Sequence, residues 1–304
     1  MIGTQFTLTN SEATSIILND FSNPDQIIAL QKYPTFDVDI KSRETDKDGQ
    51  HGIWDFYSYY GKRVVTFSGV IVGTSEADVE VVKDNLTQVL NLPVQPVSGS
   101  DGTVTLKWQD ANGLNWQLDC KLNRPVQFSR AMKQSLRLDF TFSVKSADPF
   151  IVSQNLISVT GVRGYDSAVS VFPFAIPAIM GTIGVGAVTV PNTGKVSAHT
   201  VIRIYGESAG DVTNPRIMNI TTGKTFKVNR VISGASDWIE IDTKMGTVLD
   251  QDGVDVSGDI DAGSEFVLLA TGDNSIMYLS DEDPSVTLYL PTAVFNIKYR
   301  LTKI

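Results

Sequence analysis

The chain has little cysteine and little histidine. Its 304 residues include one cysteine and two histidines. A single thiol, Cys120, forms no internal disulfide and supports no cysteine-based metal cluster. Cys120 alternates with Trp116 and Leu118 on an apolar face. We therefore interpret it as a small buried hydrophobic residue rather than a reactive thiol.

Basic residues are also in deficit, with 25 Lys and Arg against 34 Asp and Glu, for a formal net charge of −9. A surface of this sign repels phosphate backbones, so we expect no nucleic-acid partner. No stretch reaches the ~18 apolar residues that a membrane-spanning helix needs. The first twenty residues contain no basic start followed by an apolar run, so no signal peptide is predicted. The chain is expected to be soluble, without membrane insertion.

The sequence also lacks a recognisable set of residues that could act together in catalysis. His51 and His199 are far apart in the sequence, and neither lies in a metal or nucleophile motif. The glycine-rich stretch 181–186 does not fit the dinucleotide fingerprint, and no helical pattern follows it. Scattered carboxylates leave a glycoside hydrolase open only as a remote alternative. We expect no enzyme, and predict no catalytic residue, cofactor or metal site.

Two acidic stretches are candidates for calcium binding. Asp46 and Asp48 precede Gly49, but the other positions of a calcium loop are absent. The segment from Asp250 to Asp261 is the better calcium candidate, although such acidic stretches are more often solvated loops. Calcium binding there is left open.

Strand-sized segments dominate what is present. From Leu136 to Lys145 apolar residues alternate strictly with polar ones, the pattern of a half-buried strand. The strand stops before Pro149, which fixes its own φ and donates no hydrogen bond. We expect a boundary between domains 1–149 and 150–304, with Asp148, Pro149 and Phe150 as the junction and Pro149 setting the exit angle.

The first domain is predicted to be β-rich with one covering helix. Ser75 precedes Asp78 by three residues, which fits a capping box, and apolar residues recur at helical spacing up to Leu92. Strands are predicted at 5–8, 16–18, 33–40, 53–60, 63–73, 103–108 and 114–122, the last two as a hairpin, with a solvated loop at 41–52. The strand 63–73 is expected to be buried on both faces.

The segment from Ile53 to Tyr60 is mostly aromatic. Aromatic side chains form sugar-stacking platforms, and they are also enriched in cores and at subunit interfaces. We favour the core or interface reading, because no convergent polar side chains stand beside the run. The candidate interface or ligand-stacking residues are Trp54, Phe56, Tyr57, Tyr59 and Tyr60.

The second half predicts short antiparallel strands at intervals of about ten residues, as in a sandwich of two sheets. Those strands are expected at 187–190, 201–205, 215–220, 225–228, 238–241, 265–269, 276–279, 286–290 and 294–301. The apolar, glycine-rich segment 161–186 is interpreted as an irregular arm or loop.

Several turn motifs then follow in a set order. They are Val190–Gly194 (VPNTG), Val201–Gly206 (VIRIYG), Asn214–Ile217 (NPRI), Asn219–Gly223 (NITTG) and Gly272–Asn274 (GDN). Together with the helix-bearing first unit and the Ser146–Phe150 junction, this order resembles the distal tail protein family of long-tailed bacteriophages.

The resemblance implies a mainly β structural protein of the phage tail tip. The first domain would be a β-sandwich or split-barrel-like unit with one covering α-helix, and would form a hexameric ring. The second would be a galectin-like or carbohydrate-module-like β-sandwich at the periphery. Implied partners are further copies of the chain, the tail tube protein, a tail-tip hub protein, and receptor-binding or baseplate proteins. The location would be the virion tail tip, after synthesis in the host cytoplasm. A lectin-like module that contacts the host surface is the alternative.

Overall fold

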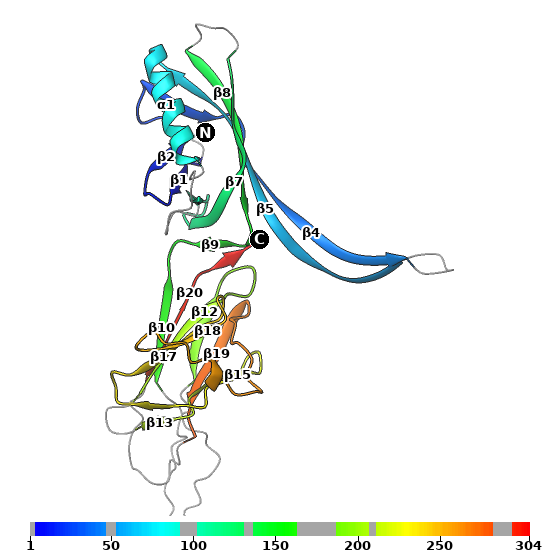
Figure 1. Ribbon diagram of the computed structural model, residues 1–304, viewed down its shortest axis with the longest axis vertical. Helices are drawn as coiled ribbons and strands as arrows, with labels where there is room; N and C mark the ends of the chain where they lie inside the picture. Colours follow the sequence, from blue (N-terminus) through cyan, green and yellow to red (C-terminus); the bar gives the residue numbers. More distant parts are fainter. Residues whose placement is uncertain are drawn as a thin grey trace, which may run out of the picture. The chain divides into compact units, whose positions relative to one another are not determined.

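The computed structural model describes residues 4–46, 53–91, 102–130, 136–162, 187–206, 211–281 and 294–304. The chain folds into two compact units, Met1–Gln154 with Ile304, and Asn155–Lys303. The prediction of a mainly β protein is confirmed (Figure 1). His51, most of the segment 161–186 and the expected strand 286–290 lie outside the described residues.

The first unit is built on one antiparallel sheet. Its strands are β1 (Phe6–Asn10), β2 (Ser15–Leu18), β3 (Gln26–Leu30), β4 (Thr35–Asp46), β5 (Ile53–Gly73), β6 (Thr103–Gln109), β7 (Asn115–Ser129), β8 (Arg137–Ser146) and β9 (Ile151–Ser153). The order across the sheet is β2-β1-β6-β7-β8-β5-β3, while β4 pairs with β5 and β9 with β7. The β6–β7 hairpin, with Gly113 at φ +79° in its turn, agrees with the sequence prediction.

The alternation predicted for β8 is present in the structure. Leu138, Phe140, Phe142 and Val144 are at most 4% exposed. The ring of Phe142 stacks on that of Phe67 in β5, with 5.0 Å between ring centroids. These side chains form the buried face of the sheet, because residues two apart on a strand point to the same side.

Helix α1 (Glu76–Val89) covers that buried face and contacts strands β1, β2, β3 and β5 (Figure 1). The Ser75 Oγ accepts a hydrogen bond from the Asp78 N–H, and the Asp78 carboxylate accepts one from the Ser75 N–H. This reciprocal pair is the predicted capping box. Val79, Val82, Leu86 and Val89 are buried, so the helical periodicity predicted the covering face. Among the described residues no helix is long and apolar enough to span a membrane.

Three predictions for the first unit were wrong. Lys41–Asp46 continues strand β4 instead of forming a loop, and the two strands predicted at 53–60 and 63–73 are one strand, β5, of 21 residues. The third error concerns burial, because most alternate residues of β5 are partly or fully open to solvent, with Lys62 exposed and Val72 36% exposed. The physical reason is that α1 covers only one face of the sheet. Strand β3 was not predicted.

The second unit is a sandwich, as predicted. Its elements are β10 (Ile157–Val162), β11 (Val188–Asn192), β12 (Thr200–Tyr205), β13 (Asp211–Thr213), β14 (Arg216–Asn219), β15 (Lys224–Lys227), β16 (Val231–Ser233), β17 (Trp238–Asp242), β18 (Thr247–Asp250), η1 (Ser257–Asp259), β19 (Gly272–Leu279), β20 (Val294–Tyr299) and β21 (Thr302–Lys303). In the described part of the chain, one sheet runs β10-β20-β12-β17-β18 and the facing one β11-β19-β14-β15, while β13 and β16 form a separate pair. Ile204 and Phe295 of the first sheet share one core with Phe226 and Tyr278 of the second.

The strand predicted at 265–269 is absent. Apart from an isolated β-bridge between Leu269 and Ala198, the carbonyls of this segment and of Ala270 accept hydrogen bonds from side chains, among them three buried asparagines. The Asn219 Nδ2 donates to the Leu268 carbonyl (3.0 Å), and the Asn192 Nδ2 donates to the Leu269 carbonyl (3.0 Å). The Asn274 Nδ2 donates to the Ala270 carbonyl at 2.8 Å. The turn motifs that carried the family resemblance therefore supply these three side chains.

Candidate functional site

Strands β4 and β5 extend together beyond the sheet of the first unit (Figure 1). Strand β8 pairs with β5 only from Arg63 to Val72, whereas β4 stays paired with β5 as far as Ile53. We call residues 38–46 and 53–62 the arm. At ~3.3 Å per residue, its two strands reach about 30 Å from the sheet.

Two β-bulges shape the arm. Val38 pairs with Arg63 and Ile40 with Tyr60, so β5 uses three residues where β4 uses two. A second shift lies between Ser42 and Glu44 and again places the extra residue on β5. Bulges bend a strand and increase its twist, which accounts for the curve of the arm in Figure 1. Gly61 sits at the first bulge, where a Cβ atom would lie 3.0 Å from the Asp39 Cβ.

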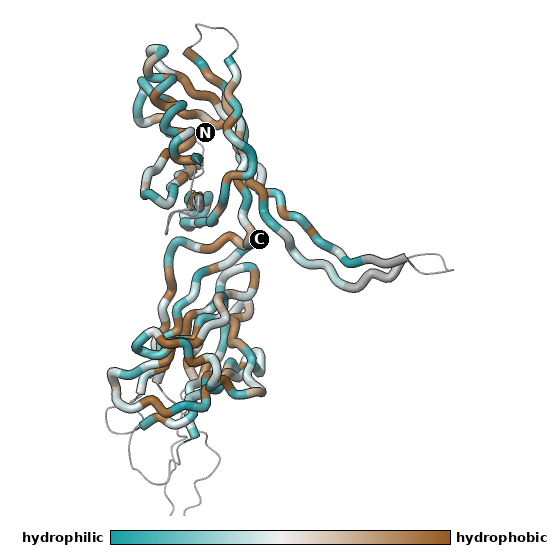
Figure 2. The backbone as a smooth tube through the Cα atoms, viewed as in Figure 1, coloured by the Kyte–Doolittle hydropathy of each residue, from teal (hydrophilic) through white to brown (hydrophobic). Residues whose placement is uncertain are grey.

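Exposed aromatic rings line the arm. Tyr57 and Tyr59 are 62% and 52% exposed, with ring centroids 6.2 Å apart, and the Lys41 Nζ lies 6.0 Å from the Tyr59 ring. Ile40 and Tyr60, which pair with each other across the two strands of the arm, are 70% and 46% exposed. In Figure 2 the described part of the arm shows short apolar segments between hydrophilic and intermediate ones. Exposed aromatic rings that lie side by side, as those of Tyr57 and Tyr59 do, favour an interaction site on the arm.

The predicted site residues thus fall on the arm and at its base. Trp54 and Phe56 lie in β5, and their side chains are outside the described part of the structure. The Tyr60 ring meets the Phe150 ring edge-on, with 6.2 Å between centroids. The Asp148 carboxylate accepts a hydrogen bond from the Phe150 N–H (3.0 Å). The structure therefore brings the aromatic run and the junction segment together at the base of the arm.

A buried arginine holds this base, and sequence reasoning missed its role. Arg63 is 2% exposed and lies where β5 leaves β8. Its Nε donates to the Pro149 carbonyl (2.7 Å) and one terminal nitrogen donates to the Phe36 carbonyl (3.4 Å). The other terminal nitrogen is buried without a hydrogen-bond partner, and burial lowers the pKa of the guanidinium. The sequence signal for a buried role was the position of Arg63, a charged residue at the start of an apolar run.

A groove lies beside the arm base, on the sheet face opposite α1. It is a cavity of 330 Å³. Its residues are Asp39, Lys62, Val64, Thr66, Asn123, Arg124, Pro125, Gln127, Thr141, Phe142 and Ser143. Strand β7 shifts register on β8 between Leu122 and Gln127, around Pro125, which opens the space. We call this the root groove. Proline within a strand run predicts a bulge, so Pro125 was the sequence signal for it.

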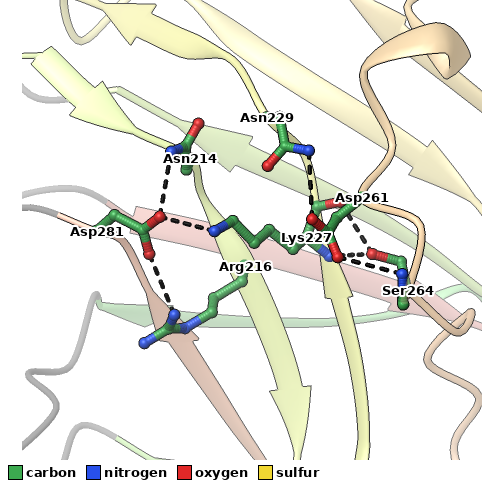
Figure 3. A network of polar contacts seen from close by, with 8 residues as sticks. Asn214, Arg216, Lys227, Asn229, Asp261, Ser264 and Asp281 are labelled. Atoms are coloured by element: carbon green, nitrogen blue, oxygen red, sulfur yellow. Dashed lines mark hydrogen bonds and ion pairs between the residues drawn. The ribbon is translucent and has the colours of Figure 1, made fainter.

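Carboxylates of the second unit are engaged in internal contacts (Figure 3). Asp281 accepts hydrogen bonds from the Lys227 Nζ (2.7 Å), the Asn214 Nδ2 (3.1 Å) and a terminal nitrogen of Arg216 (3.1 Å). The Lys227 hydrogen bond is the main cause that lowers the pKa of Asp281; burial opposes it. Lys227 also exchanges two main-chain hydrogen bonds with the Ser264 hydroxyl. This network fixes the ends of β14, β15 and β19.

In the calcium candidate, the acidic segment from Asp250 to Asp261, carboxylates are likewise engaged in internal contacts. The Asp250 and Asp259 carboxylates both bind the Arg230 guanidinium, at 3.1 and 3.3 Å. Within the described residues, no group of three or more His, Cys, Asp or Glu side chains is placed to hold a metal ion. His199 is exposed, and its Nδ1 lies 3.3 Å from the Thr243 hydroxyl.

One aromatic residue of the second unit faces outward among polar groups. On the outer face of the β12–β17 pair, the Arg203 guanidinium lies 4.0 Å from the centroid of the Trp238 ring. It also binds the Glu240 carboxylate at 2.6 Å. The guanidinium covers one ring face on which a sugar would stack, so this surface does not favour the lectin alternative.

The comparisons with known proteins agree with the fold. Residues 193–290 match the family described as siphovirus-type tail component, C-terminal domain. The resemblance to distal tail proteins is confirmed. The Dit protein of phage SPP1, described as a paradigm of hub adsorption apparatus in Gram-positive infecting phages, is 11% identical, with 98% of this chain and 99% of that chain covered and a TM-score of 0.65.

The baseplate of phage P2 in its activated conformation with Ca includes a chain that is 11% identical. The alignment covers 98% of each chain, with a TM-score of 0.48. No curated protein sequence matches this chain. The likeness to the SPP1 Dit protein shows that the two chains share a fold along nearly their full length.

Proposed function

We propose that this protein is a structural hub of a phage tail tip, and that it assembles into a hexameric ring. The ring links the tail tube to the tail-tip hub protein and to receptor-binding or baseplate proteins. The observation that carries the proposal is the arm, with its exposed Tyr57, Tyr59 and Tyr60. The siphovirus-type family match in the second unit supports the same assignment.

Exposure of the arm to water is energetically unfavourable. Aromatic side chains on a thin two-stranded ribbon have no core beneath them, and isolated ribbons are only marginally stable in water. Burial against another protein stabilises them at about 25 cal/mol per Å² of apolar surface. A head-to-tail contact through such an arm closes into a ring when the rotation between copies permits it.

The two units take different roles in this proposal. Residues 1–149 form the ring, and 150–304 form a peripheral, galectin-like sandwich that carries the outer partners. The junction Asp148–Phe150 sets the exit direction of the second unit, with Pro149 as its rigid element. The chain is made in the host cytoplasm and acts at the virion tail tip, without catalysis.

The experiment is light scattering and negative-stain imaging of the full chain over a range of concentrations. We expect closed rings with a central hole. The double substitution Tyr57→Ser and Tyr59→Ser is expected to weaken assembly, whereas Phe21→Ser leaves it unchanged. Phe21 is a matched control because it is 51% exposed and lies away from the arm. A protein that stays monomeric at every concentration contradicts the proposal.

A further inference from the structure

We propose that the root groove and the basic residues around it bind an acidic segment of another protein, held through its carboxylates. The surface lies on the face of the first-unit sheet opposite α1. Its basic residues on β7 and β8 are Lys121, Arg124 and Lys145, which we call the basic patch. This inference goes beyond the proposed ring and does not depend on it.

Strand pairing gathers the basic patch from two strands. Lys121 of β7 lies directly opposite Lys145 of β8, and Arg124 pairs with Ser143, two residues from Lys145 on the same face. All three basic residues are exposed. Like charges directly opposite each other on a sheet are destabilising. The stability of the fold therefore does not account for this arrangement, whereas an anionic partner relieves the repulsion.

Two of these cations have no internal counter-charge. In the described part of the chain, neither Arg124 nor Lys145 forms an ion pair. By contrast, Arg130, Arg203 and Arg230 each bind carboxylates of the same chain. The formal net charge of the chain is −9, so acidic residues are in excess. Unpaired cations on one face of such a chain indicate a surface for an external anion.

The root groove gives a carboxylate a defined place beside the patch. Arg124 lines the groove, and its planar set of donors matches the two oxygens of a carboxylate. Gln127 and Thr141 form an exposed cross-strand pair in the same groove and add amide and hydroxyl groups. The volume of 330 Å³ is at the small end of ligand pockets. It therefore suits a few side chains of a segment that lies across the sheet.

Acidic residues at the border of this surface favour a protein over a phosphate polymer as the partner. Asp37 and Asp39 lie on β4, and Asp119 lies on β7. The Asp39 carboxylate is 3.7 Å from the Lys62 Nζ. A polymer with a phosphate in every repeat would meet these carboxylates, and juxtaposed like charges oppose binding. A protein segment can place its carboxylates at the cations alone.

The test measures, by fluorescence anisotropy, the binding of a labelled peptide of alternating Glu and Ser residues to the full-length chain. We expect binding that weakens with salt, and no binding of the same peptide with Gln in place of Glu. Arg124→Gln and Lys145→Gln should each weaken binding about threefold. Lys195→Gln is the matched control, because it removes the same charge from an exposed position of the second unit.

Loss of affinity in both patch variants, but not in Lys195→Gln, supports the inference. Equal loss in all three variants, no binding of the Glu peptide, or tighter binding of polyglycerol phosphate overturns it. Light scattering of the same variants separates it from the proposed ring. Rings without peptide binding overturn this inference alone, and a monomeric chain that binds the peptide overturns the ring alone. If the patch variants lose the ring, the patch joins two copies and the inference is wrong.

Discussion

At the scale of single residues, buried asparagines replace a strand in the second unit. Asn192, Asn219 and Asn274 are each 0% exposed. Asn274 has most contacts, since its Nδ2 donates to Ala270 and Gly272 carbonyls and its Oδ1 accepts from the Ala270 N–H and the Asn219 Nδ2. The segment can stay irregular and buried because these amides satisfy its main-chain groups.

Replacing Asn274 by alanine is expected to destabilise the second unit by about 1–3 kcal/mol, because several buried polar groups lose their partners. The free energy of unfolding from urea titration measures this. Asn112→Ala, at the exposed turn of the β6–β7 hairpin, is the control. An equal effect of both substitutions would contradict the role assigned to Asn274.

The lowered pKa of Asp281 predicts that the free energy of unfolding depends on pH. Its pKa in the folded chain is lowered, so the fold favours the charged carboxylate. Its stabilising contribution is therefore complete above the unfolded pKa of about 3.9 and is lost as the pH falls through the lower folded value. We expect the free energy of unfolding to fall below about pH 4, with a shallower slope in Asp281→Asn. Asp84→Asn, on the exposed side of α1, should keep the native slope; identical slopes in all three proteins would refute the assignment.

At the scale of elements, Arg63 links three segments that are distant in the sequence. Through two carbonyls it joins the start of β4, the middle of β5 and the turn after β8. A buried guanidinium with an unpartnered nitrogen contributes little net stability, because its desolvation offsets its contacts. Its role is to position the base of the arm and the junction.

Arg63→Met is expected to change global stability little while loosening the junction. The Pro149 and Phe36 carbonyls would lose their donor, so local opening should become more frequent. Hydrogen exchange should accelerate in peptides that cover 147–154, with unfolding in urea as the measure of global stability. Arg124→Met, an exposed substitution in the root groove, is the control. Unchanged exchange at the junction in Arg63→Met would show that Arg63 is not its anchor.

At the scale of the whole molecule, charge opposes association. Each copy carries a formal net charge of −9, so copies repel one another at low ionic strength. Salt screens this repulsion, with a Debye length of about 8 Å at 0.15 M. Sedimentation at increasing salt should therefore show stronger assembly. If salt weakens assembly instead, ion pairs between copies outweigh the repulsion.

The elements that the sequence determined by itself are those whose signal is local. The capping box at Ser75, the alternation in β8 and the hairpin between β6 and β7 were predictable, because each depends on neighbours along the chain. The mainly β class followed from the same periodicities.

Only the tertiary structure decided the features that need partners distant in sequence. A charged stretch such as Lys41–Asp46 becomes a strand because β5 pairs with it, and Glu265–Leu269 stays irregular because asparagines from other strands bind it. The burial of Arg63 and the root groove around Pro125 likewise depend on where β4, β7 and β8 meet β5. The aromatic run was visible as an interface candidate from the sequence. Its placement on a projecting arm arises because β8 ends its pairing at Arg63 while β4 continues.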